Sequence, residues 1–143
     1  MPTQVSNVKW VGGEEFLAHM PSGHAVMFDA DRKHNSAPGP MEILLGALGS
    51  CSSVDVVEIL RKKRQKLDSL EIEISGERAA EPPTVWTKIE MVYRLTGTLD
   101  EKAVRDAVEL SQTKYCSVAA TLRKTAELTY RIEINSSKAE SQL

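Results

Sequence analysis

The spacing of hydrophobic residues predicts three short strands at the start of the chain. Apolar and polar residues alternate in three runs, and turns containing glycine or proline separate these runs. The alternating apolar pairs are Val8 and Trp10, Phe16 and Ala18, and Val26 and Phe28. This pattern is typical of an antiparallel meander. From Asp29 to Gly39 the chain is polar and rich in turn-forming residues, which predicts a loop.

A long helix is predicted from Pro40 through residues 41–66. Proline suits the first helical position, because its missing N–H would have no partner inside the helix there. The apolar stripe has a helical period and comprises Leu44, Leu48, Cys51, Val56, Val57 and Leu60. Gly46 and Gly49 each destabilise a helix interior by about 1 kcal/mol relative to alanine, so they indicate a bend or a close neighbour. The basic residues 61–64 suit a solvated helix C-terminus.

The second half of the chain predicts two antiparallel strands, two helical segments and a closing strand. Alternation over residues 70–74 and 85–95 predicts the strands. Thr98 and Glu101 have the spacing of a capping box that opens a helix. A further short helix is expected after Cys116. The expected inward residues are Val104, Ala107, Val108 and Ser111 on the first helix, and Leu128, Tyr130, Ile132 and Ile134 on the last strand.

Length and composition predict one globular domain. The chain has 143 residues, 41% of them hydrophobic and 27% charged, and we expect a single domain over residues 1–135 with a polar tail over 136–143. A net charge of -2 gives no general attraction to nucleic acid or anionic membranes. The apolar stretches look too short for a bilayer span and the N-terminus lacks a signal-like core, so we expect a cytoplasmic protein without a membrane partner.

Cys51 and Cys116 are candidates for thiol chemistry, although a free cysteine is often only a small core residue. Small residues around Cys51 leave room for a substrate, and the predicted helix start at Cys116 favours a thiolate. Asp55 lies one turn after Cys51 and opposes ionisation there, so a reactive Cys51 needs a nearby cation. Sequence spacing does not tell whether the two sulfurs meet, since a disulfide needs Cα atoms within about 7 Å.

The three histidines give little support for a metal site or a hydrolase. His19, His24 and His34 are scattered over strand and loop positions, and the chain has no CxxC pair. A thiol hydrolase would need one of them beside a cysteine. No glycine-rich phosphate-binding motif occurs, so no nucleotide cofactor is expected.

Two motifs surround the cysteines: GPMEILLGALGSC at residues 39–51 and KYCSV at residues 114–118. Together with the order of elements over nearly the whole chain, they resemble the OsmC/Ohr superfamily of osmotically inducible and organic hydroperoxide resistance proteins, in its YhfA-like branch. The resemblance implies an α+β, OsmC-like fold, with antiparallel sheets wrapped around central helices in an intertwined homodimer.

The resemblance also implies a mechanism. The cysteine that matches Cys51 attacks an organic hydroperoxide and becomes a sulfenic acid, and the one that matches Cys116 closes a disulfide. A dithiol or lipoyl-type reductant, or a small thiol, then resets the enzyme, and no metal or flavin is needed. Glu42 matches a family glutamate, and Arg32 is the arginine available to stabilise the Cys51 thiolate while Glu42 holds its guanidinium.

Helix geometry constrains the part that Glu42 can take. It lies nine residues before Cys51, which is about 13.5 Å of helical rise and roughly half a turn out of phase. A bend at the glycines, a bridging arginine or a second subunit is therefore needed to bring the two groups together. Alternatively, Glu42 only stabilises the helix N-terminus.

The leading functional prediction is a thiol-dependent peroxidase, and two alternatives stay open. One is a non-catalytic dimeric protein of the same fold that binds a small ligand or serves in a stress response. The other is a thiol hydrolase that acts through Cys51.

Overall fold

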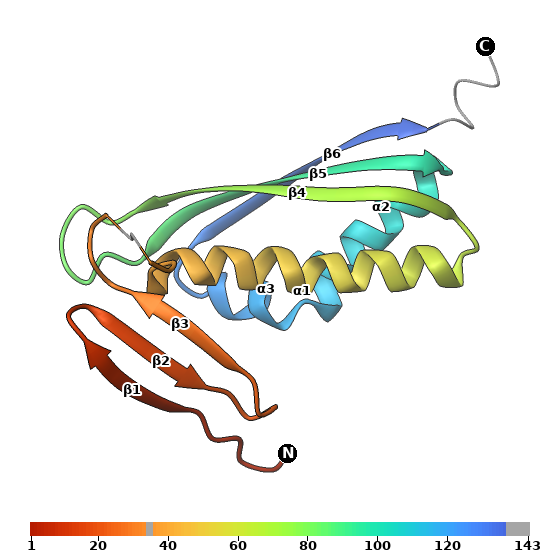
Figure 1. Cartoon of the computed structure of the whole chain (residues 1–143). Coiled ribbons are helices and arrows are strands. Elements are labelled where there is room, and N and C mark those ends of the chain that lie inside the picture. The colour runs from red at the N-terminus through yellow and green to blue at the C-terminus, as the bar shows by residue number, and fades with distance from the viewer. Residues whose placement is uncertain (34–35, 137–143) are drawn as a thin grey trace. The chain divides into compact units, whose positions relative to one another are not determined.

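The computed structural model describes residues 1–33 and 36–136 and divides into two compact units, Met1–Leu44 and Leu45–Leu143 (Figure 1). The boundary falls inside the long helix α1 (Pro40–Lys62). The expectation of one domain over residues 1–135 stays a prediction. Of the expected tail, residues 137–143 lie outside the described part, and Ser136 is the last residue of a strand.

The N-terminal unit is an antiparallel meander, as predicted. Its strands are β1 (Asn7–Gly12), β2 (Glu15–His19) and β3 (Ala25–Asp29), paired in the order β1-β2-β3. Gly12 and Gly13 form the first turn with φ of 114° and 54°, a conformation that glycine adopts without a steric penalty. The buried Asp29 carboxylate accepts hydrogen bonds from the Asp31 N–H and the Ser36 hydroxyl, which fixes both ends of the following loop.

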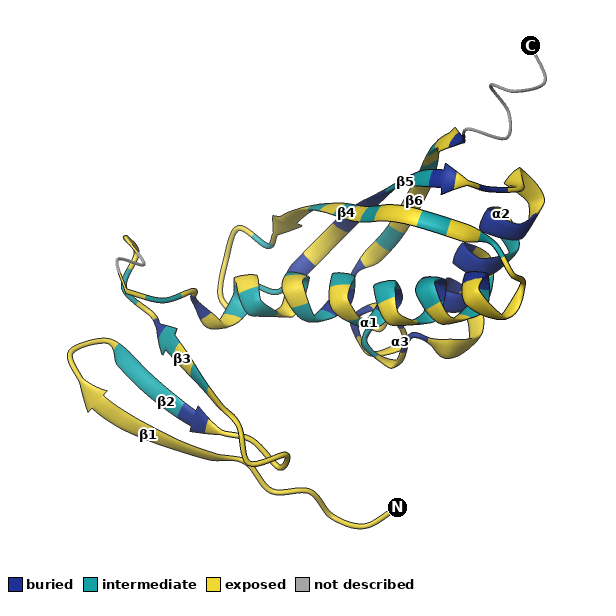
Figure 2. Ribbon diagram, turned by 45° about the vertical axis from the view of Figure 1, so that its right-hand side comes forward, coloured by how far each residue is buried: buried dark blue, intermediate teal, exposed yellow. Residues whose placement is uncertain are grey.

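The C-terminal unit places helices on one face of a three-stranded sheet (Figures 1 and 2). Its strands are β4 (Lys66–Arg78), β5 (Trp86–Thr98) and β6 (Glu127–Ser136). Its further helical segments are α2 (Glu101–Leu110), the π-helical turn η1 (Ser111–Tyr115) and α3 (Ser117–Leu122). β4 runs antiparallel to β5 as predicted, whereas β6 runs parallel to it. This pair departs from a wholly antiparallel sheet because the chain crosses over through helices between β5 and β6.

The core lies between β5 and the helices, and buried positions concentrate on β5 and α2 (Figure 2). Every second residue of β5 faces the helices, in agreement with the alternation in the sequence. The residues exposed by 1% or less include Ile89, Met91, Tyr93 and Leu95 on β5, and Val104, Ala107, Val108 and Ser111 on and after α2. The predicted inward face of α2 is therefore confirmed.

The buried stripe of α1 differs from the prediction at the cysteine. The fully buried residues are Leu48, Ser52, Val56 and Leu60. They follow an i, i+4 spacing, so the stripe includes Ser52 instead of Cys51. Cys51 is half-buried at the flank of this stripe. Leu44, predicted to be in the stripe, is 37% exposed.

The ends of two helices also differ from the prediction. α1 ends at Lys62 because Arg64 has a φ of 56°, while the N–H groups of Arg64 and Gln65 close the last turn on the carbonyls of Arg61 and Leu60. α2 is capped by Asp100, whose carboxylate accepts from the Ala103 N–H at 3.2 Å. The capping box predicted at Thr98 was therefore placed two residues too early.

The two glycines in α1 have different surroundings. A Cβ atom at Gly49 would lie 2.8 Å from Cδ1 of Ile74, so this glycine permits close packing of α1 on β4. A Cβ atom at Gly46 would meet nothing within 4 Å. α1 continues through both positions as one helix, so the close-neighbour interpretation is confirmed for Gly49.

By length and composition, α1 is apolar enough to cross a membrane. An 18-residue window in its 23 residues has a mean hydropathy of 1.7, so the expectation that all apolar stretches are too short was wrong for this helix. The central helix of a soluble protein meets the same criterion, and α1 contributes a buried stripe to the core. The composition of α1 is therefore only weak support for a membrane span.

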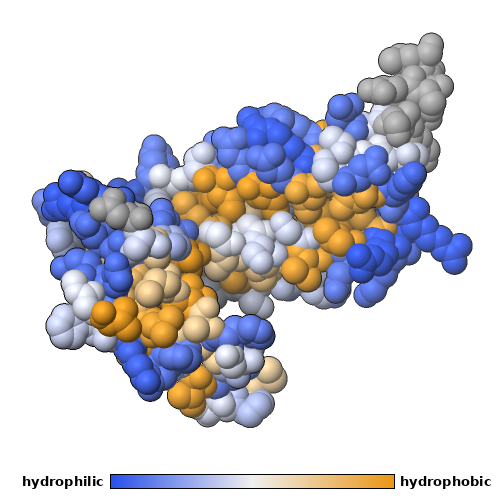
Figure 3. Space-filling model, in the orientation of Figure 1, coloured by the Kyte–Doolittle hydropathy of each residue, from blue (hydrophilic) through white to orange (hydrophobic). Residues whose placement is uncertain are grey.

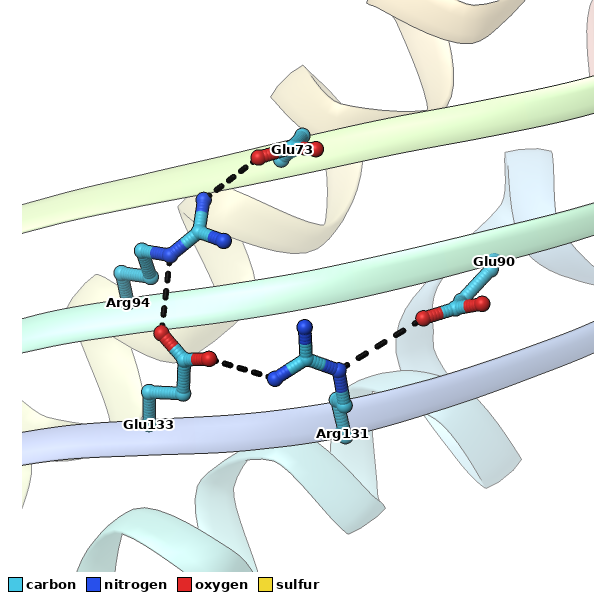
Figure 4. A network of polar contacts seen from close by, with 5 residues as sticks. All are labelled: Glu73, Glu90, Arg94, Arg131 and Glu133. Carbon is cyan, nitrogen blue, oxygen red and sulfur yellow. Dashed lines mark hydrogen bonds and ion pairs between the residues drawn. The ribbon is translucent and has the colours of Figure 1, made fainter.

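The sheet face opposite the helices carries a network of ion pairs (Figure 4). Arg94 on β5 contacts Glu73 of β4 at 2.6 Å and Glu133 of β6 at 2.8 Å. Arg131 contacts Glu133 as well, and it reaches Glu90 at 3.5 Å. Opposite charges on adjacent strands stabilise this register modestly, since all of these groups are exposed to solvent.

Candidate functional site

The fold brings the two cysteines together. Cys51 lies in the middle of α1, and Cys116 is the residue that caps the N-terminus of α3. Both are free thiols, and the two side chains are within hydrogen-bonding contact. Cys51 is half-buried, whereas Cys116 is only 3% exposed. Two thiols far apart in the sequence thus form one site with unequal access to solvent.

The surroundings of Cys116 favour its protonated form. Burial raises the pKa of Cys116 to about 11, and both the hydrogen bond to Cys51 and the negative charges of Cys51 and Asp55 add to this rise. The Ala119 N–H, 3.4 Å from the sulfur, acts in the opposite direction but is outweighed by burial. The expectation that the helix start would favour a thiolate at Cys116 was therefore wrong.

The backbone around Cys116 is held by η1. The Cys116 N–H donates to the carbonyl oxygen of Ser111 at 2.8 Å, which closes a turn of five residues. Such π-helical turns are frequent at functional sites. Because of this bond, the position of Cys116 depends directly on the position of Ser111.

A buried polar network lies beside the thiols. The Ser52 hydroxyl oxygen is 2.6 Å from Tyr93 Oη and 2.8 Å from Ser111 Oγ. Ser111 donates to Asp55 Oδ2 at 2.8 Å, and Gln112 Nε2 donates to Tyr93 Oη at 2.5 Å. The network thus connects α1, β5 and η1 with hydrogen bonds between side chains.

The network ends at Arg123, the residue that follows α3. Arg123 donates to the backbone oxygen of Gln112 at 2.6 Å and also to the side-chain oxygen Oε1 of that residue. Gln112 is 2% exposed, and Ser52, Tyr93 and Ser111 are 0% exposed. Because buried polar groups need partners, the four side chains stabilise the interior only as a connected set.

Sequence reasoning missed most of this network. It placed Ser111 on a buried helix face, but it did not single out Ser52, Tyr93, Gln112 or Arg123. One signal was available: Ser52 is in phase with Leu48, Val56 and Leu60, so a polar residue falls on a buried stripe. Its partners were not visible in the sequence, because they come from distant elements.

The remaining predicted site residues, Arg32 and Glu42, lie in the N-terminal unit. Glu42 Oε1 accepts the Gly39 N–H at 2.9 Å, so this carboxylate caps the N-terminus of α1. Arg32 is exposed, and among the described residues neither it nor Glu42 forms an ion pair. Their assistance to Cys51 stays a prediction.

Two of the three histidines, His19 and His24, lie in the described part of the chain. His24 Nδ1 lies 3.0 Å from the Ser22 hydroxyl, and both His19 and His24 are exposed. His34 lies outside the described residues. Within residues 1–33 and 36–136, no group of three or more His, Cys, Asp or Glu side chains converges in a way that could hold a metal ion.

A cavity of about 350 Å³ opens next to the polar network. Its lining residues come from α1 and the residue after it, the end of α2, and η1, and they are Asp55, Glu58, Ile59, Lys62, Lys63, Leu110 and Tyr115. Asp55 therefore belongs both to the network and to the cavity wall. Neither cysteine is among the lining residues.

Comparison with known proteins reveals extensive similarity. The sequence profile of the family described as OsmC-like protein matches residues 33–131. Protein YhfA of Escherichia coli strain K12 is 42% identical over 130 residues, which are 90% of this chain and 96% of that protein. A hypothetical protein from Aquifex aeolicus, 31% identical, has a crystal structure with a TM-score of 0.80 that covers 95% of this chain and 100% of that one.

Similarity of fold extends to more distant proteins. The crystal structure of an organic hydroperoxide resistance protein from Legionella pneumophila has a TM-score of 0.69 and covers 93% of this chain and 98% of that one. Its sequence identity is 13%, so this similarity shows the fold alone.

Two three-stranded sheets with helices define an α+β protein, and its fold is shared with the organic hydroperoxide resistance protein from Legionella pneumophila. The chain belongs to the OsmC-like family. The predicted α+β, OsmC-like fold and the predicted family are thereby confirmed, while the intertwined homodimer stays a prediction.

Proposed function

We propose that the protein is a thiol-dependent peroxidase that reduces organic hydroperoxides through Cys51 and Cys116. The observation that carries this proposal is the contact between a half-buried thiol and a buried thiol that keeps its proton at neutral pH. The more accessible thiol, Cys51, suits the attacking role, and the buried thiol, Cys116, suits the resolving role. Membership in a family whose members include organic hydroperoxide resistance proteins supports the same reaction.

The first step oxidises Cys51. Its thiolate attacks the terminal oxygen of the hydroperoxide, so that an S–O bond forms and the O–O bond breaks. Cys51 becomes a sulfenic acid, and an alkoxide leaves. Because the pKa of Cys116 is raised to about 11, this thiol still holds a proton, which it donates to the alkoxide to give the alcohol.

The second step closes the disulfide. Donation of its proton leaves Cys116 as a thiolate in contact with the oxidised sulfur. It attacks the sulfur of the sulfenic acid, an S–S bond forms, and hydroxide leaves and takes up a solvent proton as water. A dithiol or lipoyl-type reductant then supplies the two electrons that restore both thiols.

The proposal includes a cytoplasmic homodimer. A reducing compartment would keep both cysteines available for the next cycle. Hydrophobic side chains gather along α1 on the face seen in Figure 3, and Val54 of this helix is 54% exposed. A second copy of the chain would cover this surface. Arg32 and Glu42 are proposed to assist Cys51 in the assembled site, with the guanidinium stabilising the thiolate.

Mass spectrometry of the intact protein tests the reaction. After one equivalent of cumene hydroperoxide, the wild-type protein should lose two hydrogen atoms as the disulfide forms. Cys116→Ser should instead gain one oxygen and react with dimedone, because the sulfenic acid is not resolved. Cys51→Ser should abolish peroxide consumption.

Ser53→Ala is the matched control, since Ser53 is a neighbour of Cys51 on α1 and lines a hollow on the outer face of that helix. After one equivalent of cumene hydroperoxide, this variant should lose two hydrogen atoms, as the wild-type protein does. Unchanged peroxide consumption in Cys51→Ser would contradict the proposal.

The cavity beside Asp55 supports a second candidate function, binding of a small ligand without catalysis. Its wall combines two lysines and two carboxylates with apolar side chains, which suits an amphipathic molecule. In that case the wild-type mass would not change on addition of cumene hydroperoxide.

A further inference from the structure

We propose that Ser52 and Ser111 are positioning residues, whose hydroxyl groups fix the distance between the two sulfurs for disulfide closure. This inference deepens the proposed function and rests on it for its biological meaning. Neither residue touches the peroxide in this proposal. They act on the reaction through the cysteines that they hold.

The connection between the thiols is short. Ser52 follows Cys51 directly in the chain. Its hydroxyl oxygen is 2.8 Å from that of Ser111, and the carbonyl oxygen of Ser111 accepts the Cys116 N–H at 2.8 Å. One peptide link and two hydrogen bonds therefore join Cys51 of α1 to Cys116 at the start of α3.

The direction of each hydrogen bond follows from the two ends of the network. Ser111 donates its hydroxyl proton to Asp55 Oδ2, so it must accept the hydrogen bond from Ser52. Ser52 in turn accepts from Tyr93, and the Tyr93 oxygen accepts from the Gln112 amide.

At the far end, the guanidinium of Arg123 only donates hydrogen bonds. It donates to Gln112 Oε1, which fixes the orientation of that amide with its NH₂ group toward Tyr93. Every hydroxyl in the network then donates once and accepts once. A hydrogen-bonded network with a single proton arrangement holds its side chains rigidly.

A proton relay is a less suitable role for this network of hydrogen bonds. Passing a proton from Tyr93 toward Asp55 would leave a buried phenolate. Burial raises the pKa of Tyr93, and the negative charge of Cys116 adds to the rise. The network is therefore better suited to holding the two cysteines in place than to conducting protons.

The three serines around Cys51 allow a matched comparison. Ser50 and Ser53 line a shallow hollow on the outer face of α1, whereas Ser52 is 0% exposed and bonded to β5 and η1. Loss of a hydroxyl group at position 52 should therefore affect the thiol pair, and the same loss at position 53 should not.

The test separates the two chemical steps in Ser52→Ala and Ser111→Ala. Rapid mixing with cumene hydroperoxide, followed by quenching and intact-mass analysis, gives the rate of sulfenic acid formation and the rate of disulfide closure. We expect closure to slow by about tenfold to a hundredfold, as for a misplacement on the order of 1 Å, with sulfenic acid formation within about twofold of the wild type.

The double variant Ser52→Ala/Ser111→Ala provides a second criterion. If both serines act through their shared hydrogen bond, the double variant should close the disulfide no more slowly than the slower single variant. Ser53→Ala should match the wild type. Equal slowing of both steps, or closure at the wild-type rate in a folded Ser52→Ala protein, would overturn the proposal.

Equilibration with dithiothreitol keeps this test independent of peroxide chemistry. The wild-type disulfide should be harder to reduce than that of Ser52→Ala by about tenfold in the equilibrium constant. If the wild type ignores peroxide but shows this difference, the proposed function fails and the positioning role stands. If Ser52→Ala does not fold, Tyr93→Phe removes the hydroxyl that donates to Ser52 and is measured in the same way, and an equilibrium constant equal to that of the wild type would then refute the role.

Discussion

At the scale of the residue, access to solvent distinguishes the two thiols. Cys116 is 3% exposed, and the Ala119 N–H donates to its sulfur at 3.4 Å. Ionisation of this buried sulfur is costly next to the charges of Cys51 and Asp55. Its surroundings therefore hold the proton until a stronger base, such as a departing alkoxide, removes it.

The raised pKa of Cys116 predicts a stability that decreases at alkaline pH. The pKa of this thiol is 9.0 in the unfolded chain and about 11 in the folded protein. Between these two pH values the folded state keeps the proton that the unfolded state has lost, so the free energy of unfolding decreases as pH rises. The total effect should be roughly 2 to 3 kcal/mol. Urea denaturation at pH 8 and pH 11 should show a larger decrease for the wild type than for Cys116→Ser. Parallel decreases in both proteins would contradict the shift.

The cysteines could be predicted from the sequence, but the residues that hold them could not. The motifs around Cys51 and Cys116 identified both sulfurs. Counting Cys51 as apolar and Ser52 as polar, however, put Cys51 in the predicted stripe of α1 where the structure buries Ser52. Ser52 is buried because Tyr93 and Ser111 satisfy its hydroxyl, and pairing of that kind depends on the tertiary structure.

At the scale of the element, the sequence predicts which segments form and predicts their ends less well. The strands and the three α-helices of the described residues were expected from periodicity and turn residues, whereas the π-helical turn η1 was not. The end of α1 was not, because Arg64 takes a left-handed conformation that usually favours glycine. The parallel pairing of β6 was not expected either, since alternation along one strand does not specify the direction of its neighbour.

The left-handed turn at the end of α1 predicts a stabilising substitution. Arg64→Gly should raise the free energy of unfolding by roughly 0.5 to 1 kcal/mol, because a non-glycine residue is strained at a φ of 56° while glycine gives up more chain entropy. Thermal and urea denaturation measure this change. Lys62→Gly, in the last helical position of α1, is the control and should destabilise the protein. A lower stability of Arg64→Gly would show that the arginine side chain outweighs the strain.

At the scale of the whole molecule, α1 has more apolar surface than a single chain buries. Only 28% of its most hydrophobic window is buried, although the mean hydropathy of that window is 1.7. In a monomer such a surface would face water. A second copy of the chain is the occupant that the proposed homodimer would supply, and it would cover the apolar outer face of the helix that carries Cys51.

Dimerisation through α1 predicts that one charge on its outer face separates the subunits. The wild-type protein should elute at twice the monomer mass of 15.8 kDa in size-exclusion chromatography with light scattering. Val54→Asp should shift this mass toward the monomer, because burying an unpaired carboxylate in an apolar interface is unfavourable. Ala120→Asp places the same charge on an exposed position of α3 and should stay dimeric. If the wild-type protein has the mass of a monomer, the proposed interface is refuted. If Val54→Asp has the mass of a dimer, the interface lies on another surface.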